Sequence, residues 1–243
     1  MSESRGPLVV IGGHEDREGE RVILKEVARH LRGRQLLLCA AASRSPEKYL
    51  AMYRVAFADL GVELLELDAS NGGALSDGAG GVFLSGGKQG RLVRAVGGTA
   101  IERAIREIWD AGGVIAGTSA GASALGETML ARGAGELTPS EDDVQFAAGL
   151  GLVGGVIIDQ HFAERGRIGR LAAAVATRPD LVGLGIDENT ALVVTGDRLR
   201  VIGDGGVYVL DGSDAHNDGL RFRLFSSGDE FDLSRSLQAS RLP

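Results

Sequence analysis

The chain has 243 residues, a net charge of −7 at pH 7 and 44% hydrophobic residues. These values fit one large soluble α/β domain, for which we predict the boundaries 1–243 with loosely held ends at 1–7 and from about 227 to 243. The negative charge disfavours nucleic acid as a partner, and no apolar stretch approaches the roughly 18 residues of a membrane span. A single cysteine, Cys39, excludes an internal disulfide framework, and we expect a cytoplasmic location.

Short apolar runs alternate with segments of helical periodicity in the first half of the chain. The expected strands are 8–11, 36–41, 61–67, 81–85 and 113–117. The expected helices are 22–31, a segment from Pro46 to about 60, and a segment from about 99 to 111. This β-α-β alternation predicts an α/β fold, with a mostly parallel sheet that is covered by helices on both faces.

The second half of the chain changes its pattern after one more helical segment. Buried strands are expected at 156–158 and 181–186, with a basic helix at 164–178 between them. Three short strands follow at 191–195, 199–202 and 207–210, separated by glycine-rich turns. They predict a C-terminal β-meander, whereas 132–143 has the composition of a surface loop.

One serine stands where a predicted strand turns sharply into a helix, in the motif Gly117–Gly121 (Gly-Thr-Ser-Ala-Gly). Glycines on both sides of a serine relieve crowding at a strained turn, as in the nucleophile elbows of hydrolases. The N–H groups at the start of the following helix could then stabilise an oxyanion. Because the chain contains 38 glycines, the motif alone also fits a plain glycine-rich turn. Ser119 is therefore a candidate nucleophile that requires a base.

Candidate bases and acids follow other predicted strands, where the carboxyl ends of a parallel sheet form ligand sites. His161 and His14 are the two histidines in such positions, and either could act as the base of Ser119. The acid that orients this base could be Glu188 or Asp187, with Asp159 as a competitor. In the alternative interpretation, these polar side chains only pack or cap turns.

Several other chemistries are disfavoured by the motifs. The order serine, histidine, glutamate differs from the serine, acid, histidine order of the α/β-hydrolases. The turn Ile11–His14 lacks the spacing of a dinucleotide-binding loop, and the sequence has no Walker-A motif. His14 with Asp16, and Asp159 with His161, are isolated pairs without a third metal ligand, so we expect neither a metal nor a cofactor.

The combination of these motifs resembles the cyanophycinases of peptidase family S51, a group related to the aspartyl dipeptidases. The resemblance runs from about residue 8 to 212, and the stretch from Asp159 to Arg170 is its most specific part. It implies a flavodoxin-like sheet similar to that of class I glutamine amidotransferases, usually in a homodimer. It also implies a serine exopeptidase that hydrolyses cyanophycin, or multi-L-arginyl-poly-L-aspartate, to β-Asp-Arg dipeptides.

The resemblance further implies roles for individual residues. Ser119 would be the nucleophile, His161 the base and Glu188 the orienting acid. The residues that would shape the substrate pockets are Gln89, Asp159, Gln160, Arg165, Arg167 and Arg170.

Elementary chemistry is compatible with these implied roles. The oxyanion hole could use the N–H of Ala120 and one from the pair Gly86-Gly87, for which we choose Gly87. A terminal carboxylate of the substrate suits an arginine clamp. Because Arg165 and Arg167 are two residues apart, they diverge on a helix, and shared use would require a turn that enters the helix.

Two parts of the chain depart from the resemblance. Lys88 stands beside Gln89 where an acidic or neutral residue is expected, and the loop 132–143 has no obvious match. In that loop Glu141, Asp142 and Asp143 could bind the guanidinium of a substrate or simply face solvent. Two alternative functions therefore stay open: a dipeptidase acting on short aspartyl or isoaspartyl peptides, and a non-catalytic binding module.

Overall fold

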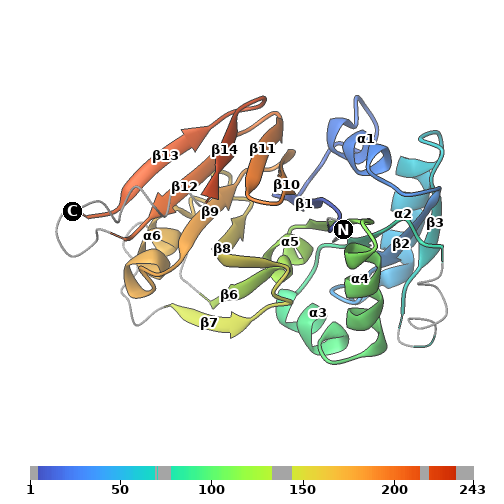
Figure 1. The fold of residues 1–243 in the computed structure, drawn as a ribbon, viewed down its shortest axis with the longest axis horizontal. Coiled ribbons are helices and arrows are strands. Elements are labelled where there is room, and N and C mark those ends of the chain that lie inside the picture. Colours follow the sequence, from blue (N-terminus) through green and yellow to red (C-terminus); the bar gives the residue numbers. More distant parts are fainter. Residues whose placement is uncertain (1–4, 69, 71–77, 133–143, 214–218, 234–243) are drawn as a thin grey trace.

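Two β-sheets with helices on their faces make up the computed structural model, which describes residues 5–68, 70, 78–132, 144–213 and 219–233 (Figure 1). Both sheets contribute side chains to one large hydrophobic core. The described helices are α1 (Val22–Arg29), α2 (Pro46–Phe57), α3 (Gln89–Val96), α4 (Ala100–Asp110), α5 (Ala120–Leu125) and α6 (Ile168–Thr177).

The first sheet has eight strands within the described residues, and the first half of the chain forms its parallel part. The parallel strands are β1 (Leu8–Ile11), β2 (Gln35–Cys39), β3 (Glu63–Glu66), β4 (Gly81–Leu84) and β5 (Val114–Thr118), in the spatial order β1-β5-β4-β2-β3. The antiparallel strands β10 (Thr190–Thr195), β11 (Arg198–Gly203) and β14 (Glu230–Asp232) extend the sheet beyond β1. The carboxyl ends of β1, β5 and β4 therefore lie next to one another.

Continuous apolar runs form these parallel strands because both faces of the sheet are buried. Leu8 and Val10 point into the core that contains residues of α3, α4 and α5. Val9 and Ile11 point to the opposite face, which packs against α1 and α2. The two faces of β1 thus have different helical partners, as the β-α-β alternation predicts.

The second sheet has six strands in the described part of the chain. They are β6 (Gly126–Arg132), β7 (Gln145–Ala148), β8 (Val153–Gln160), β9 (Val182–Ile186), β12 (Val207–Asp211) and β13 (Arg221–Phe225), in the order β13-β12-β9-β8-β6-β7. Leu171 and Val175 of α6 pack with Ile157 on one face of this sheet, and Val156 and Ile158 on the other face join the large core. Figure 1 shows α6 beside this sheet and away from α3 and α4.

Most predicted elements are present, and the α/β, flavodoxin-like class is confirmed. The expected meander is divided between the sheets: β10 and β11 pair in the first, whereas β12 pairs with β9 and β13 in the second. The expectation of a loose segment from about 227 is wrong for β14, which pairs with β11. Sequence patterns did not predict α3, β6, β7, β13 or β14. None of the helices in the described ranges is long and apolar enough to cross a membrane.

Candidate active site

The motif Gly117–Gly121 forms a strained turn between β5 and α5. Ser119 has a φ of 52° and a ψ of −111°, outside the favoured backbone regions of an L-residue. Both flanking glycines are sterically required: a Cβ at Gly117 would lie 2.6 Å from the backbone of Gly121, and a Cβ at Gly121 would overlap the carbonyl oxygen of Leu84. The turn therefore holds the serine at the end of β5, as the motif predicts.

Ser119, His161 and Glu188 form a continuous chain of hydrogen bonds. The Oγ of Ser119 lies 2.9 Å from Nε2 of His161, and Nδ1 of His161 lies 2.6 Å from Oε1 of Glu188. A carboxylate only accepts hydrogen bonds, so Nδ1 carries the proton and Nε2 of the neutral ring is free to accept from the serine. The geometry permits proton transfer from Ser119 to His161.

The backbone fixes the position of His161 at the end of β8. Its N–H donates to the carbonyl oxygen of Gly12 at 2.8 Å, and its φ is 49°. His14 and Asn189, which lie in the loops after β1 and β9, also have positive φ values of 48° and 47°. Such strained non-glycine residues concentrate at functional sites, and here they occur at neighbouring strand ends.

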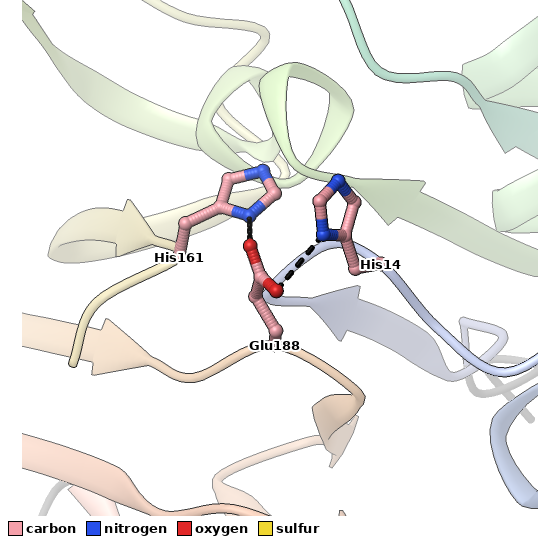
Figure 2. A group of neighbouring side chains, drawn as sticks. All are labelled: His14, His161 and Glu188. Atoms are coloured by element: carbon pink, nitrogen blue, oxygen red, sulfur yellow. Dashed lines mark hydrogen bonds and ion pairs between the residues drawn. The ribbon is translucent and has the colours of Figure 1, made fainter. Parts of the chain in front are cut away.

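Glu188 also binds a second histidine (Figure 2). Its Oε2 lies 2.8 Å from Nδ1 of His14, whose ring meets that of His161 edge to face at a centroid distance of 5.0 Å. Asp187, the alternative orienting acid, instead accepts hydrogen bonds from the N–H groups of Ala163 and Gly206, each at 2.9 Å. Asp187 therefore caps turns, and Glu188 is the acid that contacts the histidines.

Burial and neighbouring charges shift the pKa values of this pair. Burial lowers the pKa of His161, and the positive charge of Arg165 adds to this effect, although Glu188 opposes it. For Glu188, burial alone would raise the pKa, but the hydrogen bonds from His161 and His14 outweigh it and the pKa is lowered. The pair is thus held as a neutral imidazole beside a carboxylate near neutral pH.

His14, His161 and Glu188 are also the described residues that could together hold a metal ion. Each offers one ligand atom, and these atoms lie within 4.8 Å of one another. Two imidazoles and one carboxylate are a donor set used by zinc enzymes. In the structure, Glu188 joins the two rings by direct hydrogen bonds (Figure 2). The expected absence of a metal and of any other cofactor stays a prediction.

A buried hydrogen-bond network that sequence patterns did not predict supports the turn at Ser119 through Thr118. Glu15 is 2% exposed and accepts hydrogen bonds from the hydroxyls of Tyr53 and Thr118, the latter at 2.6 Å. Thr118 directly precedes Ser119 and is itself buried. Glu15 lies between the polar residues His14 and Asp16 in the loop after β1, and this sequence context does not indicate that its side chain is buried.

Asp159 holds two of the arginines that were expected to bind substrate. Its carboxylate is 1% exposed and pairs with Arg167 at 3.0 Å and with Nε of Arg170 at 2.6 Å. Burial lowers the pKa of Arg167 to about 10, although the charge of Asp159 opposes this shift. Asp159 thus fixes two guanidinium groups at the wall of the site and has little surface for direct contact with a ligand.

The remaining predicted residues lie around Ser119. The Nε2 of Gln89 donates to the carbonyl oxygen of Leu130 at 2.7 Å, and Oε1 of Gln160 lies 3.4 Å from Oγ of Ser119. Arg165 precedes α6, so the predicted turn into the helix is present. A Cβ at Gly86 would lie 3.5 Å from Cβ of Ser119, which places the loop of Gly86 and Gly87 beside the serine.

The backbone donors proposed for the oxyanion hole also border the serine. Ala120 is the first residue of α5, so its N–H has no acceptor within the helix. Gly87 has a φ of 143°, and a Cβ there would overlap the carbonyl oxygen of Ala42, so this position requires glycine. Glu141, Asp142 and Asp143, which could bind a guanidinium or face solvent, lie outside the described residues.

A cleft of about 690 Å³ contains Ser119, His161, Gln89, Gly87 and Gln160 in its wall. Its cationic lining residues are Arg17, Lys88, Arg91, Arg94, Arg165, Arg167 and Arg170. Among the described residues that line it, Glu15 is the acidic one, and the hydroxyls of Tyr53 and Thr118 already bind it. A chain of net charge −7 therefore has a positively charged cleft around its serine.

Known proteins resemble this chain in sequence and in fold. Residues 8–202 match the model of peptidase family S51. The chain is 34% identical to a cyanophycinase of Synechococcus elongatus, over 96% of this chain and 80% of that protein. It is 36% identical to a cyanophycinase of Trichormus variabilis, over 93% and 85% of the two chains. A crystal structure of a peptidase from an acI-B1 Actinobacterium aligns with a TM-score of 0.75 at 25% identity, covering 95% of this chain and 98% of that one.

These matches establish the class of the protein. The chain belongs to peptidase family S51, as the motifs around Ser119, His161 and Glu188 led us to expect.

Proposed function

We propose that the protein is a serine exopeptidase that hydrolyses cyanophycin, releasing β-Asp-Arg dipeptides from the end of the polymer. The observation that carries this proposal is the hydrogen-bond chain Ser119–His161–Glu188, with distances of 2.9 Å and 2.6 Å. The cyanophycinase names of relatives that align with most of the chain support the choice of substrate.

In this mechanism Ser119 attacks the carbonyl carbon of an α-peptide bond between two aspartyl units. His161 takes the hydroxyl proton at Nε2 as the Oγ–C bond forms. The N–H groups of Ala120 and Gly87 stabilise the resulting oxyanion. The peptide C–N bond then breaks, and His161 returns the proton to the leaving amine. Water then attacks the acyl carbon while His161 takes one of its protons, the Oγ–C bond breaks, and His161 returns the proton to Oγ of Ser119 as the carboxylic acid leaves.

Glu188 supports both proton transfers through His161. Its carboxylate keeps the Nδ1 proton in place, so that Nε2 faces the serine as an acceptor, and it stabilises the imidazolium that forms. The lowered pKa of Glu188 supports this role, because the acid stays ionised throughout the neutral pH range.

The substrate pockets are proposed to read carboxylates with the arginines around the cleft. Arg165 has no ion-pair partner among the described residues and is available for the terminal carboxylate. Gln89 and Gln160 offer amide groups to the peptide, while Asp159 keeps Arg167 and Arg170 in place. Homodimer formation and a cytoplasmic location remain predictions.

The deciding experiment is a comparison of Ser119→Ala with wild type on purified cyanophycin. We expect no detectable β-Asp-Arg release from Ser119→Ala, with circular dichroism and thermal unfolding unchanged. Ser123→Ala is the matched control, because it removes a hydroxyl from the same helix that bonds only to the carbonyl oxygen of Ile158 among the described groups. Full activity of Ser119→Ala would overturn the proposal. Cleavage of Asp-Xaa dipeptides without cleavage of the polymer would identify a dipeptidase instead.

A further inference from the structure

Three cationic residues form a row along one side of α3. Lys88 is the extended N-cap residue of α3, and Arg91 and Arg94 follow at intervals of three residues, which places these two arginines on neighbouring positions of the helix surface about 4.5 Å apart along its axis. The other face of α3 carries Leu92 and Val96, which are fully buried in the core. All three cations line the cleft that contains Ser119. We refer to Lys88, Arg91 and Arg94 as the α3 ridge.

The α3 ridge has no anionic partner within the described part of the protein. Its side chains make none of the ion pairs or hydrogen bonds there, whereas Arg106 on the neighbouring helix binds Glu102 at 2.7 Å. A Cβ at Gly90 would lie 3.4 Å from Nη1 of Arg94, so this guanidinium folds back over the first turn of α3. Lys88 and Arg94 are exposed, and Arg91 is half-buried.

The charge of the rest of the cleft is also positive. Arg167 and Arg170 share the carboxylate of Asp159, and Arg165 makes no ion pair with any residue that the structure describes. Unpaired cations of one sign on a concave surface attract anionic ligands and raise their local concentration. A ligand that carries several carboxylates can form ion pairs with several of these cations at once.

We propose that the α3 ridge is an extended subsite that binds carboxylates of substrate units next to the one being cleaved. This inference rests on the proposed function, because each unit of cyanophycin carries an arginine whose α-carboxylate is free. The ridge binds these branch carboxylates and repels the branch guanidinium groups, which turn to solvent. Lys88, which departs from the family resemblance, thereby gains a role in choosing polymer over dipeptide.

The subsite predicts an effect on binding without an effect on the chemical step. The ridge variant carries Lys88→Gln and Arg94→Gln together and changes only exposed side chains. The matched control carries Lys25→Gln and Arg103→Gln, which change the net charge by the same amount. Lys25 and Arg103 are exposed on α1 and α4 and do not line the cleft. For soluble cyanophycin segments of several units, we expect the ridge variant to raise KM about tenfold with kcat unchanged. For the shortest segment with one cleavable bond, KM stays constant.

Salt provides a second readout. Raising the ionic strength weakens the binding of long segments by wild type, and the dependence on salt becomes shallower in the ridge variant. An unchanged KM, a fall in kcat alone, or an equal change in the control variant would overturn the proposal. Adding Arg91→Gln to the double variant is expected to raise KM further.

A binding measurement separates this inference from the proposed function. In the Ser119→Ala background, the probe is fluorescein-labelled hexa-aspartate, followed by anisotropy. The ridge variant is expected to weaken binding of this probe about tenfold relative to the matched control. If wild type does not hydrolyse cyanophycin but the ridge still binds the probe, the proposed substrate fails and the carboxylate subsite stands. Equal binding by both variants rejects the subsite, whatever the hydrolysis assay shows.

Discussion

One carboxylate oxygen of Glu188 accepts a hydrogen bond from Nδ1 of His161 at 2.6 Å. The other oxygen lies 2.8 Å from Nδ1 of His14, so each carboxylate oxygen of Glu188 contacts one imidazole ring. The side chain of His14 is 65% exposed, whereas that of His161 is 4% exposed. Glu188 therefore connects a buried ring, which contacts Ser119, to a ring at the surface of the cleft.

Replacing this acid tests its proposed role. Glu188→Gln keeps the shape of the side chain but removes its charge, and its NH2 group favours the His161 tautomer that cannot accept the Ser119 proton. We expect kcat to fall about 10³- to 10⁴-fold with KM almost unchanged. Steady-state kinetics on cyanophycin segments measure both constants. Glu164→Gln is the control, since the carboxylate of Glu164 accepts a hydrogen bond from the backbone N–H of Glu188 and makes none with the histidines among the described groups. Near-normal kcat in Glu188→Gln would contradict the assignment.

The pH dependence of activity follows from the lowered pKa of His161. Only the neutral ring accepts the serine proton, so activity is lost as pH falls through this pKa, which burial holds below the usual value of about 6.5. The acid limb of kcat/KM is therefore expected below pH 6.5. Arg165→Gln removes a positive charge that disfavours the imidazolium, which raises the pKa and moves the limb to higher pH.

A pH profile of kcat/KM, normalised for each variant, measures this shift. Arg103→Gln, which removes the same charge from an exposed position on α4 outside the cleft, is expected to leave the limb in place. A limb that stays fixed in Arg165→Gln, or moves to lower pH, would show that the guanidinium does not act on His161.

The buried carboxylate of Asp159, at the end of β8, is expected to contribute more to the free energy of unfolding than a surface carboxylate does. Asp159→Asn leaves Arg167 and Arg170 half-buried without their counter-ion, and we expect the free energy of unfolding to fall by about 3 kcal/mol. Asp180→Asn removes the partner of Arg178 in an exposed pair and is expected to cost less than about 1 kcal/mol. Urea unfolding of the two variants makes the comparison. Similar losses would mean that Asp159 contributes no more than a surface ion pair.

Local sequence patterns predicted the parallel sheet and the residues at its strand ends. Apolar runs such as Leu8–Ile11 identify strands buried on both faces, and the glycines around Ser119 identify a turn that only they permit. His161 and Glu188 were candidates because they directly follow such strands. The structure brings His161 beside Ser119 and Glu188 beside His161, and their roles stay part of the proposed function.

Long-range pairing and side-chain direction were not predictable in the same way. The sequence around Val207–Asp211 does not specify whether β12 continues beside β11 or crosses to β9, because either neighbour buries the same apolar side chains. Helix α3 was missed because Gly90 interrupts its start and only Leu92 and Val96 mark its buried face. The inward direction of Asp159, which pairs it with Arg167 and Arg170, depends on packing across the sheet.

Gly13 offers a direct test of how closely the loop after β1 fits His161. Gly13 has a φ of 105°, and a Cβ there would overlap Cε1 of the His161 ring and lie 2.6 Å from Nε2. Gly13→Ala must therefore displace the imidazole from Ser119, and we expect kcat to fall about 10²-fold on cyanophycin segments. Gly33→Ala is the matched control, because Gly33 has a φ of 90° with no atom within 4 Å of its added Cβ. In both variants the positive φ of the new alanine is expected to lower the free energy of unfolding by about 1–2 kcal/mol, which thermal unfolding measures. Only Gly13→Ala is expected to lose activity, and equal kcat in the two variants would show that the His161 ring tolerates the displacement.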